Sequence, residues 1–239
     1  MRTNMKVWIF GCLIALMLVP SMFSQISEIA PRPPYLKAVP SRAAWTITTR
    51  PLVPISGEAA QPMPPSAIVK AMVEKNAGVR RVRLQTASGQ NFEFWAQGTF
   101  LFSMGSGNQS ATVVDMRGVS SPVAFYTEMQ GDFEDLKWLS SETFSTSISE
   151  KGKKLLVFQS EKGAENLKAD GEGANRMYGV KAFIDDKSRL PVRVETGSTV
   201  SQYEFTPPSG ELVLPESCRK EWERFQKYLL ETTVDTPAR

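Results

Sequence analysis

Apolar and polar residues alternate in short segments along most of the chain, and this pattern predicts a mainly β protein. Within Val79–Thr86, Val82 and Leu84 alternate with arginine and glutamine, which is the period of a half-buried strand. Polar turns separate further segments of this kind, at 92–96, 99–102, 109–116, 144–150, 154–159, 177–185, 190–196 and 199–205. The closely spaced connections leave no room for a crossover helix, so the sheet is predicted to be antiparallel.

Two segments have a helical period. Ile68–Asn76 fits a short helix as well as a strand, and the strand is favoured because a glycine turn leads directly into the next one. Near the C-terminus an amphipathic helix is predicted over 216–231. Its apolar stripe consists of Cys218, Trp222, Phe225 and Leu229. We expect this stripe to pack on the sheet or to close the opening of a curved sheet.

The first 24 residues have the layout of a secretory signal peptide. Arg2 and Lys6 precede an uncharged run of 13 residues, and Ser24 is a small residue at which a peptidase could cut. The run is shorter than the roughly 17–25 residues of a membrane-spanning helix, although extending it to Phe23 leaves an uncleaved anchor as the alternative. The chain is therefore predicted to be exported, to the periplasm or beyond. Cys12 lies inside the run and is interpreted as part of the signal.

The domain is expected to follow a proline-rich leader. Residues 25–65 hold nine of the sixteen prolines, which predicts an extended stretch that we interpret as a spacer. Within it, the aromatic and β-branched residues 44–49 are a candidate first strand that docks on the domain. The domain itself is expected over 66–239.

Composition excludes several kinds of chemistry. The chain has no histidine, and without the signal peptide it keeps one cysteine, Cys218, which is interpreted as a buried apolar residue. Histidine-dependent triads, histidine-ligated metals, iron–sulfur clusters and an internal disulfide are therefore excluded. Removing residues 1–24 lowers the net charge from +3 to about +1, so no basic field indicates a nucleic acid partner. We expect no enzymatic activity, cofactor or metal.

Two acidic groups are candidate sites. Asp185 and Asp186 end an apolar strand and precede lysine and serine, which is typical of a hairpin turn. Neighbouring residues on a strand point to opposite faces, so the pair is not suited to act as facing carboxylates. Asp132, Glu134 and Asp135 could hold calcium, but their spacing favours the start of a helix.

Several strands are apolar at consecutive positions, as in 100–102, 155–158 and 182–184. Such strands are covered on both faces or line a cavity. If a cavity is present, the candidate ligand-binding residues are Phe100, Phe102, Phe158 and Phe183. The other interpretation is a filled core beneath helix and loops.

Residues 179–214 have a distinctive order: an apolar strand, Ile-Asp, a polar turn, Leu-Pro-Val-Arg-Val-Glu, Tyr-Glu-Phe and Leu-Pro. This order resembles exported proteins of the LolA-type outer-membrane lipoprotein-sorting family. Residues 133–159 are similar to uncharacterised secreted relatives of that family. Together the two stretches cover about a quarter of the chain.

The resemblance implies a curved antiparallel sheet or half-open barrel with a helix across its opening. It further implies non-catalytic binding of a lipid, an acyl chain or a lipoprotein in an apolar cavity, without a cofactor. Membrane contact would come only through the signal segment or a lipidated partner. The alternative is a structural or protein-interaction module of the cell envelope without a small-molecule ligand, which docks through its leader or a sheet edge.

Overall fold

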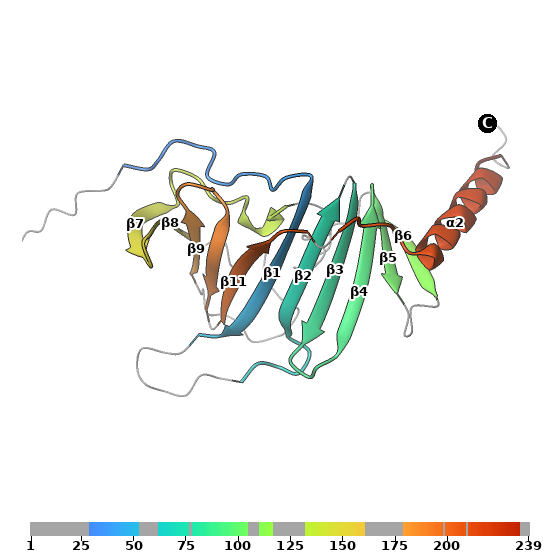
Figure 1. The fold of residues 1–239 in the computed structure, drawn as a ribbon, viewed down its shortest axis with the longest axis horizontal. Coiled ribbons are helices and arrows are strands. Elements are labelled where there is room, and N and C mark those ends of the chain that lie inside the picture. The colour runs from blue at the N-terminus through green and yellow to red at the C-terminus, as the bar shows by residue number, and fades with distance from the viewer. Residues whose placement is uncertain are drawn as a thin grey trace, which may run out of the picture.

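An open antiparallel sheet of eleven strands forms most of the described protein (Figure 1). The computed structural model describes residues 29–52, 62–76, 78–104, 110–116, 132–160, 179–197, 199–208 and 210–234, so the expected signal peptide lies outside the description. The strands are β1 (Arg42–Pro51), β2 (Ile68–Asn76), β3 (Val79–Thr86), β4 (Asn91–Gln97), β5 (Phe100–Met104), β6 (Ala111–Asp115), β7 (Phe144–Glu150), β8 (Lys153–Ser160), β9 (Val180–Asp185), β10 (Pro191–Thr196) and β11 (Thr199–Thr206). The helices are the 3-10 helix η2 (Glu134–Leu136) and α2 (Glu216–Val234). The predicted fold class, mainly β and antiparallel with a C-terminal helix, is confirmed.

The sheet consists of two meanders joined at its centre. Strands β1 to β6 pair in chain order, and so do β7 to β11, while β1 lies between β2 and β11. Trp45 on β1 stands opposite Val73 on β2 and Phe205 on β11. The segment expected as a first strand thus belongs to a central strand, and the ambiguous segment Ile68–Asn76 is a strand.

Each face of the sheet carries its own apolar residues, because cross-strand partners share a face. The first face carries Trp45, Val73, Val82, Leu156, Phe158 and Ile184. The second face carries Trp95, Phe102, Leu155, Val157 and Phe183. Strand β8 contributes to both faces, so its four central residues are all buried, as their continuous apolar run predicts.

Two segments without strands cover the first face. Val39 from the proline-rich leader is buried in the main core, with Tyr35 and Leu36 packed against it. Phe133 and Leu136 enter the same core from residues 132–139. Tyr35, Leu36 and Val39 of the leader therefore belong to the core or pack against it, which the proline density of the segment did not indicate.

Helix α2 covers one end of the second face. Cys218 is fully buried, and the Trp222 ring lies 4.0 Å from the Phe100 ring, centre to centre, in an edge-on arrangement. The helix then runs beyond strand β6 and away from the sheet (Figure 1), and Tyr228 is 61% exposed. Of the two expectations for this helix, packing on the sheet is the one observed.

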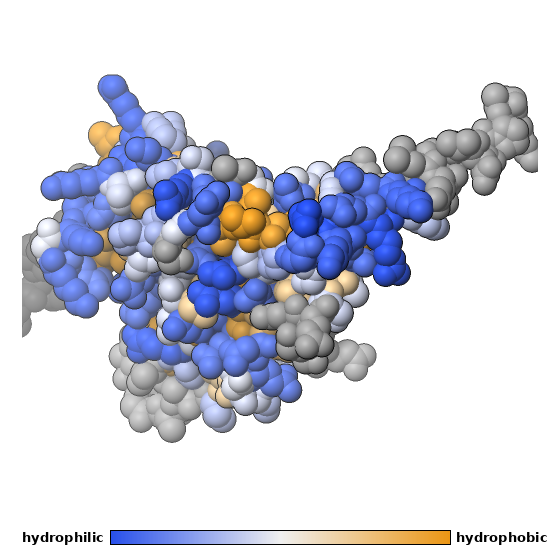
Figure 2. All heavy atoms as spheres, turned by 45° about the vertical axis from the view of Figure 1, so that its right-hand side comes forward, coloured by the Kyte–Doolittle hydropathy of each residue, from blue (hydrophilic) through white to orange (hydrophobic). Residues whose placement is uncertain are grey.

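The face of the protein seen in Figure 2 is largely polar. Figure 2 shows hydrophilic residues over most of the visible face, with hydrophobic residues confined to small groups. Phe92, Val114 and Val213 are among the large apolar side chains that are more than a third exposed. No helix in the described ranges is both long enough and apolar enough to span a membrane.

Candidate ligand pocket

A pocket of about 400 Å³ opens between the two segments that cover the first face. It is lined by Tyr35, Leu36, Lys37, Ala38, Asp132, Phe133, Leu136, Lys137 and Leu139. Five of these nine side chains are large and apolar. Ligand sites are commonly concave, mostly apolar and about 300–1,000 Å³ in volume, so both the lining and the size suit a small apolar ligand.

The wall formed by residues 132–139 is held in place by Phe133, whose side chain is 1% exposed. Its ring centre lies 5.7 Å from that of Trp45, 6.1 Å from Tyr203 and 6.0 Å from Phe205, all in tilted or edge-on arrangements. Phe133 also has a φ of 56°, a left-handed conformation that costs a side-chain-bearing residue about 1–2 kcal/mol. The aromatic contacts offset that cost.

Lys75 on β2 ties the two walls together. Its Nζ donates to the backbone oxygen of Val39 at 3.1 Å and to Oδ2 of Asp132 at 2.5 Å. Arg80 on β3 donates from Nη2 to Oδ1 of Asp132 at 2.6 Å, and its guanidinium lies 5.9 Å from the Trp45 ring centre. Both carboxylate oxygens of Asp132 are therefore bonded, and the three charged side chains are only 13–15% exposed.

The acidic group at 132–135 serves this ion network and the short helix η2. The helix begins at Glu134, near the expected helix start, and Asp132 bonds to Lys75 and Arg80. Within the described ranges, no group of three or more histidine, cysteine, aspartate or glutamate residues is placed to hold a metal ion.

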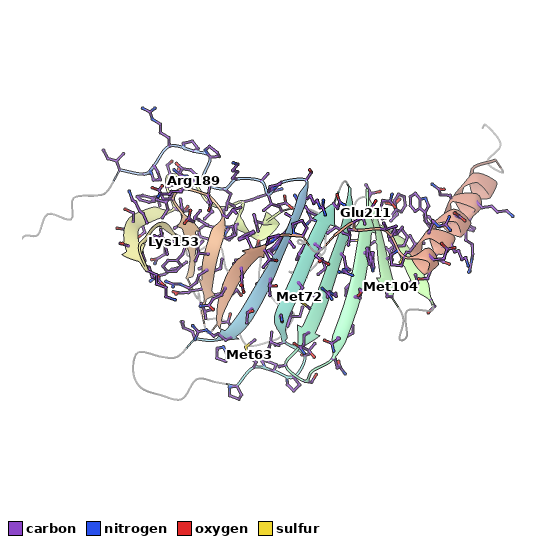
Figure 3. All side chains as sticks on the ribbon, viewed as in Figure 1. Met63, Met72, Met104, Lys153, Arg189 and Glu211 are labelled. Carbon is purple, nitrogen blue, oxygen red and sulfur yellow. The ribbon has the colours of Figure 1, made fainter. Side chains whose placement is uncertain are left out.

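The opposite wall comes from the leader. The Tyr35 ring lies 5.2 Å from that of Phe158 on the first face, edge-on. The backbone N–H of Lys37 donates to the carbonyl of Arg189 at 2.9 Å, which attaches the leader to the β9–β10 hairpin. Figure 3 labels Arg189 at this hairpin, beside the leader. The leader wall is thus attached by this aromatic contact, by this backbone hydrogen bond and by the hydrogen bond from Lys75 to Val39.

A smaller pocket of about 230 Å³ lies on the second face, where the connection to α2 passes over β2, β3 and β4. Arg81 lies 5.3 Å from the Trp95 ring centre and donates from Nε to Oε2 of Glu74 at 2.8 Å. The indole of Trp95 donates to Glu93 at 2.7 Å. Arg81 and Glu74 of this pocket are bonded to each other, and the pocket is smaller than the first, so it is the weaker candidate for a ligand.

The four phenylalanines predicted to bind a ligand do not lie together. Phe100 and Phe102 lie on the second face near α2, and Phe183 lies on that face at the other end. Six strands separate β5 from β9, namely β4, β3, β2, β1, β11 and β10. Phe158 alone of the four is on the first face, beneath Tyr35. A direct ligand contact by any of the four stays a prediction.

Asp185 and Asp186 form the tip of the β9–β10 hairpin, as predicted. Oδ1 of Asp185 accepts hydrogen bonds from the backbone N–H of Lys187 at 3.1 Å and of Ser188 at 2.7 Å, and from the Ser188 hydroxyl at 2.9 Å. Partial burial acts to raise the pKa of Asp185, but these hydrogen bonds outweigh it and lower the pKa. Asp186 pairs instead with Arg189 at 3.3 Å.

Replacing Asp185 with alanine is expected to cost about 1 kcal/mol of unfolding free energy at pH 7, because three donors lose their acceptor at an exposed turn. The folded-state pKa is lowered, so the carboxylate stabilises the fold above its unfolded pKa, near 3.8, and this is lost as the pH falls through the folded pKa. Urea titrations of both proteins from pH 7 to pH 3 should show the difference shrinking below about pH 4. Asp186→Ala is the control, and an equal loss in it would contradict the role of Asp185.

Cys218 is a buried apolar residue, as interpreted from the sequence. Its Sγ lies 3.1 Å from Sδ of Met104, which Figure 3 shows on β5 beside the start of α2. Burial raises the pKa of the Cys218 thiol to about 11. The thiol therefore stays protonated at neutral pH and supports the packing of α2.

The pocket residues of the leader were missed because proline density dominated the interpretation of residues 25–65. A usable signal was present: Tyr35, Leu36 and Val39 are large apolar residues close together between the prolines of residues 31–40. No local signal joins Lys75 to Asp132, which lie 57 residues apart.

Neither a protein-family model nor a curated protein matches the sequence. Several solved structures are similar in fold. A LolA superfamily protein is among them. That protein, from Nitrosomonas europaea, is 11% identical to this chain, with a TM-score of 0.32. The aligned region covers 75% of this chain and 90% of that protein.

Two further structures show a comparable likeness. The lipoprotein LppX of Mycobacterium tuberculosis is 11% identical, with 73% of this chain and 90% of that chain covered and a TM-score of 0.41. A chain of the MucA/MucB complex of Pseudomonas aeruginosa is 14% identical, with a TM-score of 0.33. The aligned region covers 74% of this chain and 57% of that chain. The likeness is one of fold, and the residues of this chain itself carry the proposals that follow.

Proposed function

We propose that this protein is an exported, non-catalytic binding protein that takes up a lipid or a lipidated partner in the pocket between residues 35–38 and 132–139. In this proposal residues 1–24 direct export, and the domain expected over 66–239 is completed by the leader (25–65), which supplies Val39 and the central strand β1. The observation that carries the proposal is the apolar lining of an open 400 Å³ pocket that lies on the aromatic core.

The driving force would be removal of an acyl chain from water. Each buried methylene contributes about 0.8 kcal/mol, so a modest length of chain suffices for micromolar binding. Leu36 and Leu139 are half-buried, so a ligand can cover them without opening the core. Phe158 supports this site from beneath through its contact with Tyr35.

The test is binding of a neutral fluorescent apolar probe, 1-aminoanthracene, to the purified protein and to two variants. Leu36→Asp places a charge on the pocket wall and should weaken binding of the probe at least about tenfold. The loss of the leucine contact and the desolvation of the carboxylate together cost more than about 1.4 kcal/mol of binding free energy. Val213→Asp is the matched control, since Val213 is 65% exposed and lies at the second pocket. Circular dichroism checks that both variants fold.

If the wild-type protein binds no probe, the pocket is rejected as the ligand site. The same conclusion follows if Leu36→Asp binds the probe as tightly as Val213→Asp does. Native mass spectrometry of protein purified from the expressing cells, followed by lipid extraction, should detect a co-purified acyl compound. The N-terminal sequence of the same sample tests removal of residues 1–24.

A protein-interaction role is the second candidate. It is favoured by helix α2, which extends beyond the sheet and presents Tyr228 at 61% exposure (Figure 1). If no lipid-like probe binds, this helix becomes the first surface to map for a partner protein of the cell envelope.

A further inference from the structure

Tyr35 stands between the 400 Å³ pocket and two further aromatic rings. It is one of the lining residues, and its ring centre lies 5.2 Å from that of Phe158. Phe158 is completely buried and is not among the described lining residues, and its ring centre lies 5.6 Å from that of Phe144 on β7. On this side the pocket therefore ends at the Tyr35 ring, and apolar side chains lie directly behind it.

The lining becomes more buried from the leader surface inward. Lys37 is exposed, Tyr35 and Leu36 are half-buried, and Phe133 and Leu136 are only 1% exposed. An apolar chain gains binding free energy by leaving water, so its end points inward while a polar head stays at the exposed side. A chain that points inward along the leader wall meets Tyr35.

The Tyr35 ring is held in place by the residues that follow it. The backbone N–H of Lys37 donates to the carbonyl of Arg189 at 2.9 Å, and the backbone oxygen of Val39 accepts from Lys75 at 3.1 Å. Val39 is itself buried in the core. These attachments lie two and four residues after Tyr35, so the ring stays over Phe158 and acts as a fixed end of the pocket.

We propose that Tyr35 determines how long an apolar chain this pocket binds, because its ring blocks the way to Phe158 and Phe144. This inference rests on the proposed function and deepens it. Each methylene that is buried before the ring tightens binding about fourfold, and methylenes beyond that length stay in water and add nothing. Removing the ring joins its space to the pocket, and apolar spaces left by such truncations can take up benzene-sized groups.

The experiment measures how the affinity of the full chain depends on ligand length. The ligands are n-alkyl glucosides from hexyl to tetradecyl, each below its critical micelle concentration and competing with 1-aminoanthracene. Their head is uncharged and constant, so only the chain varies. In the wild-type protein the affinity should rise about fourfold per methylene and then level off. In Tyr35→Ala it should rise for at least about two further methylenes, which makes the longest glucosides bind more than about tenfold more tightly relative to the shortest.

Phe144→Ala is the matched control. It removes another ring that lies beside Phe158, but Phe144 is not among the described lining residues. Tyr35 still separates the new space from the pocket, so the affinity should level off at the wild-type length. Tyr35→Phe keeps the ring and should keep the wild-type profile. Tyr35→Leu removes less of the side chain and should give a smaller extension, which serves as the test if circular dichroism shows that Tyr35→Ala does not fold.

The outcomes separate this inference from the proposed function. If the affinities of the wild-type protein and Tyr35→Ala change in parallel across the series, Tyr35 does not set the length, and an apolar binding site remains. An equal extension in Phe144→Ala would also overturn the inference, because the effect would then come from a loosened aromatic core. If the wild-type protein binds neither 1-aminoanthracene nor any glucoside, the proposed function itself is rejected.

Discussion

Replacing Phe133 with alanine is expected to lower the free energy of unfolding by about 3–5 kcal/mol. The ring is almost completely buried against Trp45, Tyr203 and Phe205, and it carries the wall of the pocket onto the sheet. Alanine leaves a cavity that the surrounding strands cannot fill, because they are held by their ladder. Urea titration followed by far-ultraviolet circular dichroism measures the change.

A glycine variant separates the ring from the backbone at this position. Phe133→Gly removes the same ring but accepts a φ of 56° without steric cost, so it should be at least as stable as Phe133→Ala despite the greater chain entropy of glycine. Phe92→Ala is the control for a partly exposed ring, since Phe92 is 45% exposed, and should cost less than about 1 kcal/mol. A loss in Phe133→Ala no larger than in Phe92→Ala would show that residues 132–139 do not depend on this anchor.

Replacing Asp132 with alanine is expected to cost about 2–4 kcal/mol. The substitution leaves Lys75 and Arg80 without their shared carboxylate in a site where all three side chains are only 13–15% exposed. Removing one partner of a buried ion pair typically costs about 3–5 kcal/mol, and the residual exposure lets water screen part of it. The same urea titration measures the loss.

The pair energy is isolated by a double-mutant cycle of Asp132→Ala with Lys75→Met. We expect a coupling of at least about 1 kcal/mol, because Lys75 bonds Asp132 directly and would otherwise remain as an unpaired cation. Asp186→Ala is the control, because it breaks a more exposed ion pair at the β9–β10 hairpin. It should lower the free energy of unfolding by less than about 1 kcal/mol. Additive effects of the two substitutions would mean that Lys75 and Asp132 do not stabilise each other.

Both substitutions act on the same wall of the pocket, and this links stability to the proposed binding site. Phe133 holds the wall through apolar burial, whereas Asp132 holds it through two cations of β2 and β3. The wall is therefore secured by two unlike interactions at adjacent residues.

The local pattern of the sequence determined the strands, the hairpin and the helix. Alternation in Val79–Thr86 and the continuous apolar run in β8 follow from which side chains face a core, a property that each strand displays by itself. The turn at Asp185 follows from bonds between residues at most three positions apart. The stripe that begins with Cys218 and Trp222 determined which side of α2 packs on the sheet.

Only the tertiary structure decided how these elements meet. The pairing of β1 with β11 joins residues about 150 positions apart, and no local signal selects it. Together with the register of the other strand pairs, that pairing places Phe158 on the first face. It places Phe100, Phe102 and Phe183 on the second face.

The pocket arises in the same way, from the leader and residues 132–139 meeting over one face through Lys75. Periodicity shows that a residue faces a core but not which distant residue it faces, because that partner is chosen by long-range register and packing. The sequence by itself therefore determined what each segment is, and the tertiary structure decided which segments form the pocket.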